Sequence, residues 1–244
     1  MTTPPQANRL KRGVDTAQRF VATRLPWTKH RLGPLRDGVV GTLTLTALLI
    51  LVYQTELLVA ARFGFQTPYA MFTSLPVQAK PVLAATLGPL LHNSDSHIIR
   101  NLGVLLLAGA YVEYYSSERL LYAFFLVAGY LAAWFPLIFG ATGSLGASGV
   151  TYGLQSWMAV YAVASIIVML ADPAHLLDRR IGHIVPLLFG AGTTLSITMS
   201  GLGGSLSGAG EATHFLGAIV GLGWGFFVVF YSSSTPRETV LLAE

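Results

Sequence analysis

The feature that most constrains this chain is a series of long apolar stretches that carry almost no charge. Five or six of them approach the roughly 20 apolar residues that a helix needs to cross the hydrocarbon core of a bilayer. Hydrophobic residues make up 53% of the 244 residues and charged residues only 11%. A soluble domain usually carries roughly 25% charged residues. Because lipid must then solvate much of the surface, we expect an all-α integral membrane protein.

Six membrane-spanning helices are predicted, and the fifth is the weakest because it is short and rich in Gly and Thr. A long connector, residues 61–96, separates the first two spans and carries aromatic residues such as Phe63, Tyr69 and Phe72. Such rings favour the headgroup level, so the connector is predicted to form short helices in the membrane interface. The predicted spans are residues 38–60, 97–114, 119–140, 148–171, 181–199 and 212–231.

Positive charge is concentrated before the first span, where eight of the 15 Lys and Arg lie. With the N-terminus inside, the inner segments of a six-span chain hold twelve of them, and the outer side holds Arg62, Lys80 and Arg100. This asymmetry favours cytoplasmic N- and C-termini in a cell membrane, and we expect a prokaryotic one. An organellar transit segment is the alternative for the basic N-terminus, although Asp15 and the Pro4-Pro5 pair weaken it.

Three segments follow from this organisation. Residues 1–37 form a basic cytoplasmic N-terminal segment, residues 38–231 the six-span domain and residues 232–244 a cytoplasmic tail. No cleavable signal peptide is expected, because the first apolar run begins late and is too long. A nucleic-acid-binding arm is disfavoured because the basic cluster adjoins a membrane span.

The residue types exclude several classes of site. The chain has no cysteine, so disulfides, thiolate metal sites and cysteine nucleophiles are ruled out. No metal motif of convincing spacing is present, and the glycine-rich run at residues 200–211 lacks a P-loop lysine. We therefore expect no cofactor, no metal and no nucleotide. The run at 200–211 is predicted to be a flexible cap over the site, or else a plain connector.

The second, fourth and sixth spans all run from outside to inside, so their first residues meet on the outer side. Polar side chains lie at these three ends, where they normally face a bundle interior or an aqueous cavity. The sequence therefore predicts one polar site near the outer surface. Its members are His92, His97 and Asn101 at span two, Gly146-Ala147-Ser148-Gly149 at span four, and His214 at span six.

These residue types fit nucleophilic catalysis by serine. A serine hydroxyl needs a neighbouring base, and a neutral imidazole is suited to that work near pH 7. Ser148 begins a predicted helix, whose free N–H groups would stabilise an oxyanion. His97 and Asn101 are four residues apart, hence on one helix face, and both can donate hydrogen bonds to complete the oxyanion hole.

The sixth span carries Gly217 and Gly221 near the face of His214. Small residues at this spacing let two membrane helices pack backbone to backbone, and span four is the expected partner. That packing would bring His214 to Ser148. Tyr152, one turn after Ser148, is expected to stack on the imidazole ring.

Each signal taken alone has a simpler explanation. A Gly-x-Ser-Gly sequence is more often packing than catalysis in a glycine-rich membrane protein, and a lone His214 is compatible with a proton relay in a transporter. Glu56 is expected to face the membrane interface, and Glu113 is expected to make a structural hydrogen bond. The joint arrangement of the polar residues on alternate spans is what favours a catalytic site.

These motifs resemble those of the rhomboid family of intramembrane serine proteases. They are His92, His97 and Asn101, then Gly146-Ala147-Ser148-Gly149 with Tyr152, then His214 with Gly217 and Gly221, and together they extend over residues 88–225. The resemblance implies a six-helix bundle with Ser148 as nucleophile and His214 as general base. It assigns oxyanion binding to His97, Asn101 and the Ser148 backbone, ordering of the first loop to His92, and support of His214 to Tyr152.

The resemblance also implies substrates that are transmembrane segments, cut near their outer end. Two family features are absent: the Trp-Arg pair of the first loop, and the basic pattern after Glu113, where Tyr114, Tyr115 and Ser116 stand instead. Neither involves the dyad, so activity is still expected. The alternatives are a catalytically silent relative that binds transmembrane helices and a small transporter that uses the polar cavity.

Overall fold

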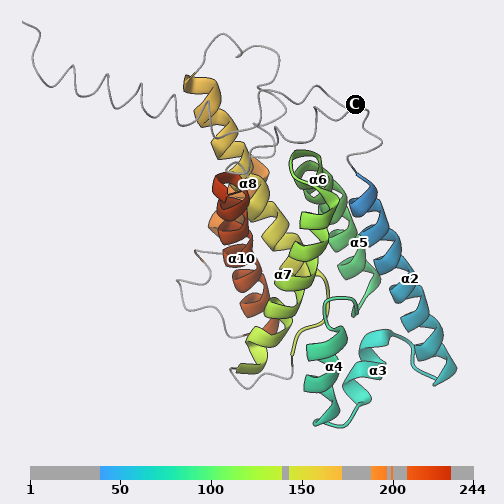
Figure 1. The fold of residues 1–244 in the computed structure, drawn as a ribbon. Helices are drawn as coiled ribbons and strands as arrows, with labels where there is room; N and C mark the ends of the chain where they lie inside the picture. The colour runs from blue at the N-terminus through green and yellow to red at the C-terminus, as the bar shows by residue number, and fades with distance from the viewer. Residues whose placement is uncertain (1–38, 139–142, 172–187, 197–198, 200–207, 232–244) are drawn as a thin grey trace, which may run out of the picture.

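The structure is a computed structural model that describes residues 39–138, 143–171, 188–196, 199 and 208–231. Every regular element in these ranges is helical, and Figure 1 shows α7 standing between α10 on one side and α2, α5 and α6 on the other. The elements are α2 (Val40–Arg62), α3 (Pro68–Ser74), α4 (Ala79–Leu87), α5 (Asp95–Val104), the π-helical η3 (Leu105–Gly109), α6 (Ala110–Tyr115), α7 (Glu118–Ile138), α8 (Ser148–Ala171) and α10 (Ala209–Tyr231).

Within the described residues, three helices are long and apolar enough to cross a membrane: α2, α7 and the part of α10 up to Val229. They correspond to the predicted first, third and sixth spans. The predicted second span coincides with the continuous stretch α5–η3–α6, which its π-helical turn divides, and the predicted fourth span has the bounds of α8. Of the predicted fifth span, residues 188–196 and 199 are helical, and residues 181–187 lie outside the described part.

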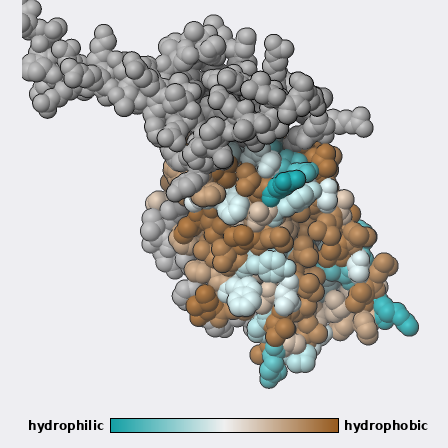
Figure 2. All heavy atoms as spheres, in the orientation of Figure 1, coloured by the Kyte–Doolittle hydropathy of each residue, from teal (hydrophilic) through white to brown (hydrophobic). Residues whose placement is uncertain are grey.

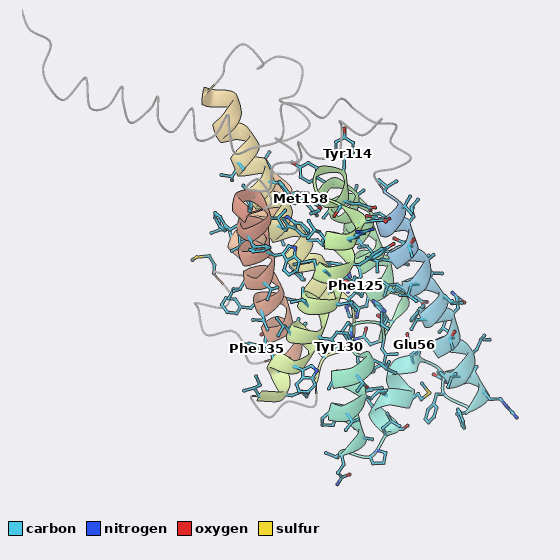
Figure 3. All side chains as sticks on the ribbon, viewed as in Figure 1. Glu56, Tyr114, Phe125, Tyr130, Phe135 and Met158 are labelled. Atoms are coloured by element: carbon cyan, nitrogen blue, oxygen red, sulfur yellow. The ribbon has the colours of Figure 1, made fainter. Side chains whose placement is uncertain are left out.

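The predicted terminal segments, 1–37 and 232–244, also lie outside the described residues, as do residues 200–207 of the predicted cap. Within the connector, two short helices are present as predicted, α3 and α4. Two side chains of α7 donate hydrogen bonds to backbone carbonyls near the end of α4. Tyr130 Oη donates to the carbonyl oxygen of Thr86 at 3.1 Å, and Trp134 Nε1 donates to that of Ala85 at 3.0 Å (Figure 3 labels Tyr130).

The outer surface of the helices is strongly apolar. Leu58 is 72% exposed, Leu107 68% and Ile138 75%, and brown hydrophobic residues cover much of the face seen in Figure 2. In water, each exposed leucine or isoleucine would forfeit about 2 kcal/mol of burial free energy. A chain with this surface is an integral membrane protein whose lipid-facing residues are solvated by acyl chains.

The closest helix pair is α8 with α10, and glycines make it possible. A Cβ atom at Gly217 would collide with the carbonyl oxygen of Gly149, and one at Gly221 with that of Gly153. The two backbones therefore touch over two consecutive turns. In lipid, where the hydrophobic effect does not drive helices together, such close van der Waals packing supplies much of the association.

The first helix is held at its N-terminus by Glu113 of α6. The Glu113 carboxylate accepts hydrogen bonds from Gly41 N, Thr42 N and Thr42 Oγ1, each at 2.7 Å. The first N–H groups of a helix have no intrahelical partner, and a carboxylate there also complements the helix dipole. The predicted structural hydrogen bond of Glu113 is confirmed, and it ties α2 to α6.

Candidate active site

Ser148 is the first residue of α8 and follows a sharp turn. Gly146 in that turn has φ +119°, a conformation that favours glycine, and any Cβ there would strike the imidazole of His97. The N–H of Gly146 donates to the carbonyl oxygen of Gly88 at 2.7 Å, which anchors the turn to the end of α4. Ser148 is thus presented at a helix start, where backbone N–H groups lack intrahelical partners.

A cavity of about 790 Å³ opens beside this helix start. Five predicted site residues line it together: Ser148, His214, His97, Asn101 and Tyr152. They come from α5, α8 and α10, the three elements whose predicted outer ends were expected to converge. The wall is completed by residues of α3, α4, the 143–145 segment and the helical 188–196 segment.

The candidate nucleophile and base differ in exposure. Ser148 is 4% exposed, whereas His214 is half-buried. The ring of Tyr152 lies on the His214 imidazole, with centroids 4.2 Å apart and planes at 34°. Among the hydrogen bonds of the described residues, none joins Ser148 to His214. The two side chains share one cavity, and such catalytic pairs are often loose until a substrate binds.

His97 is held by a residue that the sequence reasoning missed. Its Nδ1 atom lies 2.8 Å from the side-chain oxygen of Asn93, one helical turn earlier. On the other side its ring rests on Gly146. The sequence did contain a signal for this contact, because Asn93 is a polar residue four positions before His97. Asn93 and Gly146 together restrain the His97 ring at the cavity wall.

Asn101 is oriented by His92. The Nδ1 atom of His92 lies 3.1 Å from the carbonyl oxygen of Leu90, which can only accept, so Nδ1 carries the proton. Nε2 of His92 therefore accepts from the Asn101 amide nitrogen, at 3.0 Å. The Asn101 side-chain oxygen lies 3.4 Å from Thr151 Oγ1. Asn101 also lines the cavity, and among the described residues its amide nitrogen makes no hydrogen bond besides that to His92.

His92 itself is fully buried and lies behind Asn101. Burial, reinforced by the nearby His97, lowers the pKa of His92 to about 4, so the imidazole is neutral at pH 7. Its backbone N–H donates to both carboxylate oxygens of Glu56, at 3.1 and 3.2 Å. Tyr53, on the same helix as Glu56, donates to the carboxylate of Asp95.

The Glu56 contact corrects one prediction. Glu56 was expected to face the membrane interface, but it is only 8% exposed and points inward from α2 (labelled in Figure 3). Its position in an apolar helix gave no sign of its partner, because the partner is a backbone N–H from a distant loop. Through Glu56, the first helix fixes the loop that carries His92.

The remaining predicted site residues lie outside the cavity wall. Gly146 shapes the turn before Ser148, and Gly217 and Gly221 form the α8–α10 contact described above. Two further residues make contacts that the sequence did not predict: Thr151 lies against the Asn101 side-chain oxygen, and Asp95 accepts a hydrogen bond from Tyr53. The helices and the cavity that they line define a helical integral membrane protein with a candidate site between its helices.

Comparison with known proteins gives the family. The Rhomboid domain model matches residues 82–231, so the chain belongs to the rhomboid family, as its motifs predicted. It is similar to the rhomboid protease GlpG of Haemophilus influenzae (strain ATCC 51907 / DSM 11121 / KW20 / Rd). The two are 27% identical over 190 residues, which cover 76% of this chain and 88% of that protein.

Proposed function

We propose that this chain is an intramembrane serine endopeptidase with Ser148 as nucleophile and His214 as general base. The observation that carries the proposal is that both side chains line one cavity, although they belong to different helices. The glycine contact between α8 and α10 supports it, because Gly217 lies against Gly149, the residue after Ser148. Packing this close leaves little freedom for the two groups to move apart.

The reaction is acyl transfer to serine followed by hydrolysis. His214 accepts the proton of Ser148 Oγ as that oxygen attacks the substrate carbonyl, and then gives the proton to the leaving amine as the C–N bond breaks. His214 then takes a proton from a water molecule, which attacks the ester carbonyl. As the ester C–O bond breaks, His214 returns that proton to Ser148 Oγ. The Tyr152 ring restrains the His214 imidazole throughout.

The oxyanion hole is the second part of the proposal. The backbone N–H of Ser148 and the second N–H of the Asn101 amide are its donors, and His97 joins them from Nε2 when its imidazole is protonated, because the proton on Nδ1 is directed at the Asn93 side-chain oxygen. His92 acts through Asn101 as a positioning residue and is joined to Glu56 through its backbone. Donors of this kind contribute roughly 10²–10³-fold each to kcat when they face the developing charge.

We further propose the six-span topology with both termini cytoplasmic, in a prokaryotic cell membrane. The apolar exposed surfaces of α2, α7 and α10 support the spans, and the basic residues before residue 37 support the orientation. The substrates are transmembrane segments of other membrane proteins, cut near their outer end. The cavity, on that side of the bundle, supplies the water.

A fluorophosphonate probe and a transmembrane-segment substrate test the proposal on the purified chain. We expect labelling and cleavage by the wild-type protein, and neither by Ser148→Ala or His214→Ala. Ser156→Ala is the matched control, because Ser156 lies on the same helix with its hydroxyl bonded to Thr194 at 2.9 Å. Full cleavage by Ser148→Ala would refute the proposal. Substrate binding without labelling or cleavage by the wild type would favour the catalytically silent alternative.

A further inference from the structure

The cavity carries charge of one sign. Among the described residues that line it, the charged ones are Lys80 of α4 and Arg100 of α5, and both are cations. Arg100 directly precedes Asn101, the proposed oxyanion donor. The remaining lining residues are neutral polar or apolar, apart from the two histidines. The cavity beside Ser148 and His214 thus presents two positive groups, of which Arg100 is exposed and Lys80 is half-buried.

Among the described residues that line the cavity there is no Asp or Glu. Glu56 is engaged with the His92 N–H, and Asp95 accepts from Tyr53. Glu211 is exposed on α10 and does not line the cavity. Residues 200–207, the glycine-rich segment before α10, contain no ionisable side chain.

Within the part of the chain that the structure describes, the Arg100 side chain makes one hydrogen bond. Its Nε donates to the carbonyl oxygen of Ser96 at 3.1 Å, one turn back along α5. This bond directs the side chain along the helix and leaves the N–H groups of both terminal nitrogens for a ligand. A guanidinium in that state matches a carboxylate in a bidentate pair.

We propose that Arg100, assisted by Lys80, selects substrates that carry an Asp or Glu beside the cleaved bond; this rests on the proposed protease function. A substrate entering the cavity displaces water from these cations. A neutral or basic substrate residue beside the cleaved bond then leaves the charges of Arg100 and Lys80 uncompensated. A substrate carboxylate at that position gives these cations a hydrogen-bonded partner in place of the lost water. Because the partners lose water on binding, the ion pair is screened less than one at an open surface.

The test uses matched transmembrane substrates that differ only in having Asp, Asn or Lys at each position flanking the cleaved bond. We expect the wild type to cleave the best Asp substrate with a kcat/KM on the order of tenfold above its Asn counterpart, the ratio expected of one partly desolvated ion pair. Arg100→Gln should bring this ratio close to one, Lys80→Gln should reduce it, and Arg100→Glu should favour Lys over Asp.

Arg62→Gln is the matched control, because Arg62 is an exposed outer-side cation at the end of α2 that does not line the cavity. It should keep the wild-type ratio. Each ratio is taken within one variant, so a general loss of activity does not mimic a loss of selectivity. Binding of the Asp and Asn substrates to Ser148→Ala gives the same comparison without catalysis.

The outcomes separate the two proposals. An absence of probe labelling in the wild type would refute the protease function, whereas labelling and cleavage with equal rates for Asp and Asn would refute the selectivity alone. The assay is run in vesicles of phosphatidylcholine with and without phosphatidylglycerol. A rate that follows the anionic lipid, and not the substrate residue, would assign the cations to lipid headgroups and overturn the proposal.

Discussion

The amide nitrogen of Asn101 donates to Nε2 of His92 across 3.0 Å, and both side chains are buried. The proton on the opposite ring nitrogen of His92 is held by the Leu90 carbonyl oxygen. This pair fixes which end of the Asn101 amide faces the cavity. In the proposed mechanism, His92 therefore acts on the oxyanion hole without touching the substrate.

Replacing His92 tests that relationship. His92→Ala removes the acceptor and frees the Asn101 amide to rotate, so we expect kcat to fall by about 10–100-fold with little change in KM, since the donor acts on the transition state. His92→Gln retains a side-chain acceptor and should recover part of the rate. Steady-state kinetics on one transmembrane substrate measure both. Equal losses in the two variants would indicate a packing role only.

The buried His92 also predicts a pH effect on stability. Its pKa is near 4 in the folded protein, against 6.5 for an exposed histidine, so the unfolded chain binds more protons between these values. Its contribution is therefore complete above pH 6.5 and is lost as the pH falls towards 4.

We expect the thermal midpoint in detergent to fall between pH 7 and pH 4.5, and to fall less in His92→Gln, which has nothing to protonate at that position. The comparison between the two proteins isolates this group from other titrating residues. An identical decrease in both would remove His92 as a source of the effect.

The α8–α10 contact predicts opposite outcomes for two glycines of one helix. Gly217→Ala places a methyl group against the Gly149 carbonyl oxygen, so the helices must separate, at a cost of about 2 kcal/mol or more. We expect a lower unfolding midpoint and a loss of Ser148 labelling. Gly223→Ala meets nothing within 4 Å and should be neutral or slightly stabilising. Labelling by Gly217→Ala at the wild-type rate would contradict the packing argument.

Glu113 and Glu118 give a matched pair of substitutions near the first residues of α2 and α7. In Glu113→Gln, one amide nitrogen faces donors that now lack an acceptor, so we expect stability to fall by about 1–3 kcal/mol. Glu118→Gln is the control, because Glu118 is exposed at the start of α7. Unfolding in mixed detergent with sodium dodecyl sulfate measures the difference. Equal effects of the two substitutions would show that the Glu113 carboxylate contributes no specific stability.

Some of the fold and of the candidate site followed from local pattern. Apolar length predicted α2, α7 and α8 to within a few residues, because crossing a bilayer sets a minimum helix length. The alternating direction of the predicted spans places the starts of α5, α8 and α10 on one side, so the sequence alone groups Ser148, Asn101 and His214. The fifth span was least certain, since Gly and Thr weaken the hydropathy signal.

Other features had no local signature. The π-helical turn of η3 depends on how the chain packs, and its sequence, residues 105–109, reads as ordinary apolar helix. The roles of Glu56 and Thr151 come from partners 36 and 50 residues away. A carboxylate in an apolar helix indicates that a hydrogen-bond partner exists, but the sequence does not indicate which residue provides it.

The sequence by itself determined that this chain is a helical membrane protein, and its motifs identified the family, because hydropathy and residue spacing are local properties. Only the tertiary structure decided that Glu56 faces inward, that His92 orients Asn101 and that Lys80 and Arg100 border one cavity. Those facts depend on which buried donors and acceptors meet. Most buried polar groups need a hydrogen-bond partner, and only the folded chain decides which donor meets which acceptor.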